Sequence, residues 1–183
     1  STHPDFPRLK LNLATMKPGL SFLDLKTQKV TGVFELPPEY HQLSIRHLAE
    51  GPHKSVVFGG QYQGAQTDKV HLVGVKKWSD NSLKLFDLPP DVEASLKQYV
   101  GSVAALQDGS QIAITCPRGG EVIILDGRNG DFIKRYQQED VCGVVAHQGR
   151  FLFTSGNGQV ILNPAQRGID TAGAWDNHIT PLF

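Results

Sequence analysis

The sequence predicts an all-β fold, and within that class a partial β-propeller. Three observations support this prediction: short apolar runs, an internal repeat, and tight polar turns between the runs. The 183 residues include 19 glycines and 11 prolines, which separate runs such as residues 55–58 (SVVF) and 111–114 (QIAI). Short runs rich in β-branched and aromatic residues that end at glycine-bearing turns are typical of strands.

An internal repeat indicates how the strands are grouped. Residues 20–38 (LSFLDLKTQKVTGVFELPP) align without a gap on residues 72–90 (LVGVKKWSDNSLKLFDLPP), at an offset of 52 residues. The same two-strand pattern returns in residues 122–137, and again as a single strand in residues 159–163. A hairpin precedes each of the three later units, with turns such as Gln107-Asp108-Gly109-Ser110. Each repeat therefore holds four antiparallel strands, named A to D, which is the pattern of a propeller blade.

The repeat also predicts the extent of the blades. A half blade spans residues 19–36, two blades follow at 43–88 and 100–137, and a last blade begins at 141, with its outer strand expected at 179–183. These about three and a half four-stranded antiparallel blades are fewer than the 4–8 of a closed ring. Residues 1–183 are therefore predicted to be a single propeller fragment, which pairs with a missing N-terminal half or with a second copy. The one expected helix covers residues 91–98, after Pro89-Pro90.

Composition narrows the function classes. Lys plus Arg and Asp plus Glu both number 18, so the formal charge is zero, which argues against nucleic acid as a partner. The longest apolar run, residues 122–125, is far shorter than the roughly 18 residues of a membrane span. Because the first residue is Ser1 and not methionine, we expect the chain to be processed or excised from a longer product.

Candidate binding residues lie where strand alternation predicts a common face. The B–C loops and the D–A connections leave the strands on the same side of a propeller, and function usually resides on loops held by a rigid scaffold. The candidates on this face are His41, Gln61, Tyr62, Arg118, Asp140 and Cys142.

Each candidate has a structural alternative. The imidazole of His41 suits a metal ion or a hydrogen bond to the backbone of a neighbouring blade. Arg118, beside two glycines, suits a carboxylate or phosphate, or else bridges blades. Tyr62 either stacks on a ligand or covers the channel mouth. Cys116 and Cys142 are both expected on this face, and a disulfide between them stays open.

Enzyme signatures are missing from the sequence: we find no GxSxG, HExxH, P-loop or dinucleotide-binding motif. The residues therefore favour a binding protein over an enzyme and assign no cofactor. A metal- or ligand-binding propeller, with or without catalysis and with its site at the top of the central channel, is the alternative.

Several longer segments resemble a bacterial family. They are THPDFPRLKLNLATMKPGLSFLD (2–24), HQLSIRHL (41–48), QYQG (61–64), YVGSVA (99–104), PRGG (117–120), DVCGV (140–144) and WDNHITPL (175–182). Together they are similar to the family catalogued as domain of unknown function 1513, which is grouped with WD-repeat-like propellers. Many members have cysteine in place of Gly60 and serine in place of Cys116, so a cysteine pair is not implied.

The resemblance implies an exported protein of about twice this length, often with a twin-arginine signal, folded as a propeller of about seven blades. This chain would be its C-terminal half. Members tend to be encoded near periplasmic iron-uptake components such as imelysin-like proteins. We therefore expect a non-catalytic binding platform in the bacterial periplasm, linked to iron uptake through protein partners.

Overall fold

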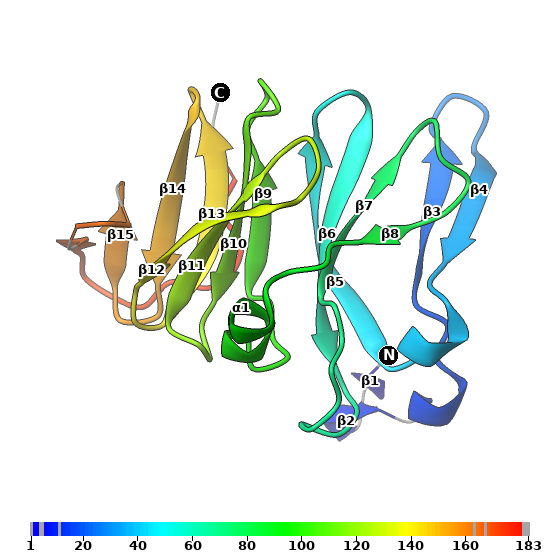
Figure 1. Ribbon diagram of the computed structural model, residues 1–183, viewed down its shortest axis with the longest axis horizontal. Helices are drawn as coiled ribbons and strands as arrows, with labels where there is room; N and C mark the ends of the chain where they lie inside the picture. Colours follow the sequence, from blue (N-terminus) through cyan, green and yellow to red (C-terminus); the bar gives the residue numbers. More distant parts are fainter. Residues whose placement is uncertain (1, 4–5, 11, 163, 167, 181–183) are drawn as a thin grey trace.

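The computed structural model describes residues 2–3, 6–10, 12–162, 164–166 and 168–180, and it is an open series of antiparallel sheets (Figure 1). A short hairpin of β1 (Thr2–His3) and β2 (Phe6–Lys10) precedes a 3₁₀ turn at Leu13–Thr15. The half blade follows as β3 (Gly19–Asp24) and β4 (Lys29–Glu35), and a second 3₁₀ turn covers Pro38–Tyr40.

Three four-stranded sheets come next, and each matches one predicted blade. The first contains β5 (Leu43–Gly51), β6 (Ser55–Tyr62), β7 (Val73–Lys77) and β8 (Lys84–Leu85). The second contains β9 (Ser102–Ala105), β10 (Gln111–Cys116), β11 (Glu121–Asp126) and β12 (Phe132–Gln137). The third contains β13 (Val141–His147), β14 (Arg150–Ser155), β15 (Gln159–Ile161) and β16 (Ile169–Asp170).

The order of strands in each sheet follows the chain, which confirms the predicted all-β class and the A-to-D blade pattern. The first strand of each four-stranded sheet faces its neighbours, because β9 contacts both β5 and β13. Figure 1 shows the sheets side by side, from β3–β4 at one end to β13–β16 at the other. The sheets do not close into a ring.

The expected helix is present as α1 (Pro90–Ser95), in the connection between β8 and β9. It is shorter than the predicted span of 91–98. Lys97 and Gln98 both have positive φ angles, of 47° and 56°, so the chain leaves the helical conformation there.

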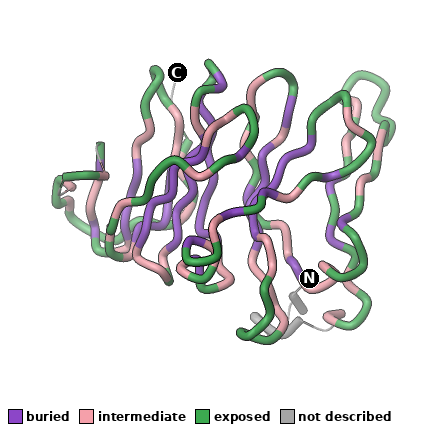
Figure 2. The backbone as a smooth tube through the Cα atoms, viewed as in Figure 1, coloured by how far each residue is buried: buried purple, intermediate pink, exposed green. Residues whose placement is uncertain are grey.

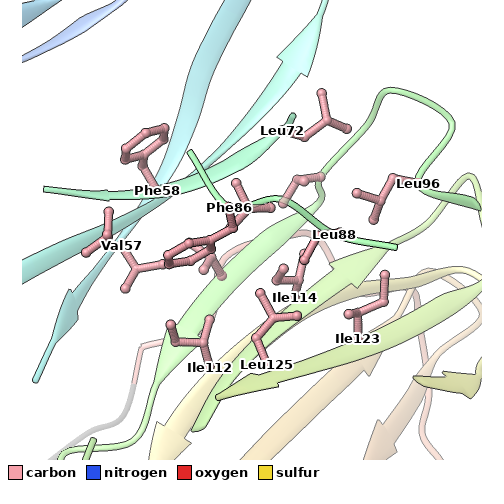
Figure 3. Packing of buried hydrophobic residues seen from close by; sticks show 14 of the residues in the cluster. Val57, Phe58, Leu72, Phe86, Leu88, Leu96, Ile112, Ile114, Ile123 and Leu125 are labelled. Carbon is pink, nitrogen blue, oxygen red and sulfur yellow. The ribbon is translucent and has the colours of Figure 1, made fainter. Parts of the chain in front are cut away.

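The main core lies between the sheet β5–β8 and the sheet β9–β12 (Figure 3). Val57 and Phe86 point from one sheet toward Ile112 and Leu125 of the other. Aliphatic and aromatic side chains that leave water at such an interface contribute roughly 1.5–3 kcal/mol each. This packing fixes how adjacent blades sit against each other.

Strands β9, β10 and β11 are buried on both faces, which explains the unbroken apolar run in β11, whereas the outer strand β12 is largely exposed. In β11, Ile123 and Leu125 belong to the core shared with β5–β8, whereas Val122 and Ile124 belong to a second core shared with β13–β16. Alternate residues of a strand point to opposite faces, so a strand between two blades needs apolar residues at every position. The run at residues 122–125 is thus the signature of an interior blade.

The outer strand of the last blade differs from the prediction. Residues 179–183 were expected there, but Ile169 and Asp170 form β16 and pair with Val160 and Gln159. Residues 169–170 follow β15 more closely in the sequence than residues 179–183 do, and they form the outer strand of this blade. Residues 181–183 lie outside the described residues.

The segment after β16 returns to the inner side of the sheets. The carbonyl oxygens of Trp175 and Asp176 lie 3.2 and 3.6 Å from Sγ of Cys142, at the start of β13. The ring of His178 lies 5.5 Å from that of His47 on β5. The C-terminal segment therefore connects two inner strands that belong to different blades.

The half blade leaves one apolar face uncovered. Phe22 packs toward the next blade, where it meets Trp78 with ring centroids 5.3 Å apart. The opposite face of β3–β4 and its turn expose Leu23, Leu25, Val30 and Val33, with exposed fractions of 56–84%. Burial is concentrated in the central sheets (Figure 2). No helix in the described part of the chain is long and apolar enough to cross a membrane.

Candidate functional site

The B–C loops and the D–A connections lie on one face, which we call the loop face. Backbone hydrogen bonds join them in each complete blade: Tyr62 N–H donates to Gln98 O at 3.1 Å, Gln138 N–H to Gly120 O at 2.7 Å, and Gly156 N–H to Asp140 O at 3.0 Å. The placement follows from strand alternation, because both kinds of connection leave the sheet at the same end. Of the six predicted candidates, His41, Arg118 and Asp140 lie in these segments, and the other three lie at the adjoining strand ends, Gln61 and Tyr62 in β6 and Cys142 in β13.

His41 has a local structural role. It follows the 3₁₀ turn at Pro38–Tyr40, and its Nδ1 lies 3.1 Å from the carbonyl oxygen of Pro38. The ring is half-buried and is engaged with its own turn, where the sequence suggested a neighbouring blade. Among the described residues, the one group of three or more metal-ligating side chains lies elsewhere and does not include His41.

Gln61 and Tyr62 join one blade to the connection that follows it. Gln61 forms a β-bridge with Tyr99, and its side-chain amide lies 3.5 Å from Val100 O. The hydroxyl of Tyr62 donates to Oδ2 of Asp68 at 2.9 Å. Burial, and then this bond to Asp68, raise the pKa of Tyr62. Tyr62 thus anchors the loop at residues 63–72.

Arg118 and Asp140 are also fixed by nearby groups. The guanidinium of Arg118 lies 4.3 Å from the centroid of the Tyr99 ring, in a cation–π contact. Asp140 has a positive φ of 48°, and its carboxylate packs directly against Gly156, where a Cβ would overlap it. These side chains stabilise the loop face, and the structure does not bring them into one pocket.

Cys116 and Cys142 are buried free thiols. Sγ of Cys116 lies 3.1 Å from Leu96 O, while Sγ of Cys142 bonds to carbonyl groups of Thr154 and Trp175. Burial raises the pKa of Cys116 to about 11 and also raises that of Cys142. Thiols in this state are poor nucleophiles, so neither cysteine suits a reactive role.

A pocket of about 620 Å³ opens on the loop face beside α1. One wall is the loop at residues 66–72, and the other is formed by Asp87, Leu88, α1 and residues 97–98. Gln98 holds the two walls together, because its side-chain amide donates to Ala65 O at 2.8 Å and to Asp68 O at 3.1 Å. The volume lies within the usual range of small-ligand sites, about 300–1,000 Å³.

Three side chains of this pocket form a cluster that the sequence analysis missed: His71, Asp87 and Glu93. Nδ1 of His71 lies 2.8 Å from Oε2 of Glu93, and one ligand atom from each of the three residues lies within 4.8 Å of the others. Burial raises the pKa of Glu93, although His71 and the backbone of Leu72 act in the opposite direction. Oε1 of Glu93 is buried and has no hydrogen-bond partner in the described structure.

The repeat contained a signal for one member of this cluster. At the offset of 52 residues, Glu93 takes the position that His41 takes in the preceding repeat, just after Leu-Pro-Pro. His71 corresponds to Gly19, so the earlier repeat lacks an imidazole at that position. His41, the candidate chosen from the sequence, and Glu93 thus occupy equivalent positions of two repeats.

Comparison with known proteins agrees with this architecture. The profile of the family described as "Protein of unknown function (DUF1513)" matches residues 1–182. The chain belongs to this family. A search of curated proteins finds no match.

Solved structures show similarity to propellers. The WD40 repeats of RRP9 superpose with a TM-score of 0.57 at 12% identity, covering 82% of this chain and 45% of that one. U3-55K gives 0.56 at 12% identity, with 82% and 46% covered. Hydrazine synthase of Kuenenia stuttgartiensis gives 0.55 at 15% identity, with 78% and 38% covered. The chain spans less than half the length of these three, and identities this low show the fold alone.

Proposed function

We propose that this chain is part of a β-propeller that serves as a non-catalytic binding platform, and that its binding site is the pocket beside α1. The observation that supports the proposal most strongly is the pocket itself. It combines an apolar floor with charged side chains, and it lies between segments held by Tyr62 and Gln98. A rigid scaffold that presents loops on one face is the usual arrangement of a binding site.

The lining indicates the kind of ligand. Val70, Leu72 and Leu88 supply apolar surface, whereas Lys69 and Lys97 supply cationic groups. Apolar walls with a few placed polar groups suit a small molecule or a protruding peptide side chain.

Filling the pocket tests the proposal. Ala94 is exposed on α1 and lines the pocket, so Ala94→Trp is expected to block it without disturbing the core. The probe is a panel of small organic acids, amines and short peptides, tested by ligand-induced shifts in Tm. Wild type and the matched control Ala172→Trp are expected to respond to the same members, and Ala94→Trp to lose those responses. Responses unchanged in Ala94→Trp, or no response in any variant, would contradict the proposal.

A further blade is proposed to cover the exposed face of β3–β4. The other face of this half blade already packs on the next blade through Phe22, and in the similar propellers the part aligned with this chain covers less than half of the length. Blade-on-blade packing therefore suits the apolar residues Leu23 and Val33.

Periplasmic location, Tat-dependent export and a role in iron uptake remain proposals supported by the family resemblance. Osmotic-shock fractionation of cells that express the complete gene product is expected to release it with the periplasmic proteins, and its level is expected to rise under iron limitation. A cytoplasmic fraction or an iron-independent level would contradict these proposals.

A further inference from the structure

His71, Asp87 and Glu93 lie together although they come from three different segments. His71 precedes β7, Asp87 follows β8, and Glu93 lies in α1. One ligand atom from each lies within 4.8 Å of the other two. Bonds of about 2.0–2.2 Å to a common ion would bring these atoms slightly closer, which side-chain rotation can supply.

We propose that these three residues form a binding site for a divalent transition-metal ion or Zn²⁺. One imidazole and two carboxylates are a ligand set suited to Zn²⁺, Mn²⁺ or Co²⁺. The set contains no thiolate, which a site for Cu⁺ would favour, and its imidazole is not a ligand that Mg²⁺ or Ca²⁺ prefers. The two carboxylates balance the charge of the ion.

The surroundings supply independent support for a cation. Oε1 of Glu93 is buried and lacks a hydrogen bond in the described structure, so a cation would satisfy a group that is otherwise costly to bury. Asp68, Asp87 and Glu93 outnumber Lys69 and Lys97 in the lining of the pocket, which leaves an excess of negative charge. The pocket also gives the ion an open side for water or a further ligand.

The positions of the ligands are held by groups that do not bind the ion. Gln98 and Tyr62 fix the loop that ends at His71, through the carbonyl of Ala65 and the carboxylate of Asp68. Asp91, on the first turn of α1, pairs with Arg135 of β12 at 3.3 Å and connects the helix to the next strand. A preorganised ligand set binds an ion with less loss of conformational freedom.

The test is a titration of the chelator-treated chain with Zn²⁺, followed by Co²⁺ absorption spectroscopy. Wild type is expected to bind one equivalent and to give a visible Co²⁺ spectrum. Asp87→Asn and Glu93→Gln are expected to weaken binding by at least about tenfold, because even loss of a group that only orients a metal ligand typically costs that much. His41→Ala is the matched control and is expected to bind as wild type does. Asp87 is exposed, so Asp87→Asn is expected to fold normally.

Two outcomes would overturn the metal site. One is the absence of saturable Zn²⁺ binding up to about 1 mM, an affinity weaker than about 4 kcal/mol. The other is saturable binding that Asp87→Asn and Glu93→Gln leave unchanged, which would indicate adventitious binding to other histidines. The proposal builds on the proposed function because it uses the same pocket. The titration needs no organic ligand, so the two proposals can fail separately. If wild type binds no metal but responds to the ligand panel, only the metal site is overturned. If wild type binds the metal but responds to no member of the panel, only the proposed function is overturned.

Discussion

The side chain of His47 is expected to make the free energy of unfolding depend on pH. It lies on the inner strand β5 with an exposed fraction of 8%, and its Nε2 is buried without a hydrogen-bond partner in the described structure. Burial, followed by the nearby His178 and Arg46, lowers its pKa from 6.5 to about 4. The folded state therefore favours the neutral imidazole, whereas the unfolded chain takes up the proton at a higher pH.

The sign of this effect predicts a loss of stability in acid. The contribution is complete above pH 6.5 and is lost as the pH falls from there toward 4. At about 1.4 kcal/mol per pKa unit, the loss amounts to about 3 kcal/mol. Urea unfolding of wild type and His47→Leu at pH 7.5 and 4.5 measures it. The variant is expected to lose less stability in acid than wild type, while His147→Gln, which changes an exposed histidine, should behave like wild type. Equal losses in wild type and His47→Leu would contradict this account.

The contacts of individual side chains were the feature of the structure that the sequence predicted least well. Strand alternation predicts a common face for His41, Arg118 and Cys142, but the partners of each side chain depend on tertiary contacts. Arg118 stacks on Tyr99, and Cys142 bonds to a segment more than 30 residues away. No local pattern encodes such contacts.

At the scale of the strands and turns, contact between blades depends on glycines, because the absence of a Cβ leaves room for a side chain of the neighbouring blade. Gly130, in the turn between β11 and β12, is buried and has a φ of 84°. A Cβ at this position would overlap the ring of Phe86, which belongs to the adjacent blade. Gly149, in the turn between β13 and β14, has a similar φ of 73° but no atom within 4 Å of an added Cβ.

This pair separates backbone strain from steric overlap. Gly149→Ala is expected to cost about 1 kcal/mol of unfolding free energy, because alanine disfavours positive φ. Gly130→Ala carries the same strain and also forces Phe86 to move, so we expect a loss of about 3 kcal/mol. Chemical denaturation of both variants measures the difference. Equal losses of unfolding free energy in the two variants would show that the contact between Gly130 and Phe86 does not contribute to packing between the blades.

The strands were predictable because the repeat places their boundaries four times, whereas the pocket was not. Residues 63–70 carry no strand pattern and have no counterpart in the other repeats, and Gln98 and Tyr62 hold this loop beside α1. His71 and Glu93 therefore meet through the tertiary placement of this loop, which no strand pattern predicts.

For the whole molecule, the interior and the ends differ in how their faces are covered. Strands β9, β10 and β11 are buried on both faces, while β3–β4 exposes Leu23 and Val33, with exposed fractions of 56% and 60%. The repeat predicted an incomplete ring correctly, because the number of blades can be counted from the sequence. The repeat makes no prediction about the exposed face of β3–β4, because a strand pattern describes only the sheet that it forms.

The most direct test of the propeller platform is a crystal structure of the complete gene product. We expect a further four-stranded blade to pack on Leu23 and Val33, with the blades β5–β8 and β9–β12 arranged as described and the pocket beside α1 open to solvent. The account would be contradicted if this face of β3–β4 were left in solvent or covered by a second copy of the chain. It would also be contradicted if the pocket were filled by other parts of the protein.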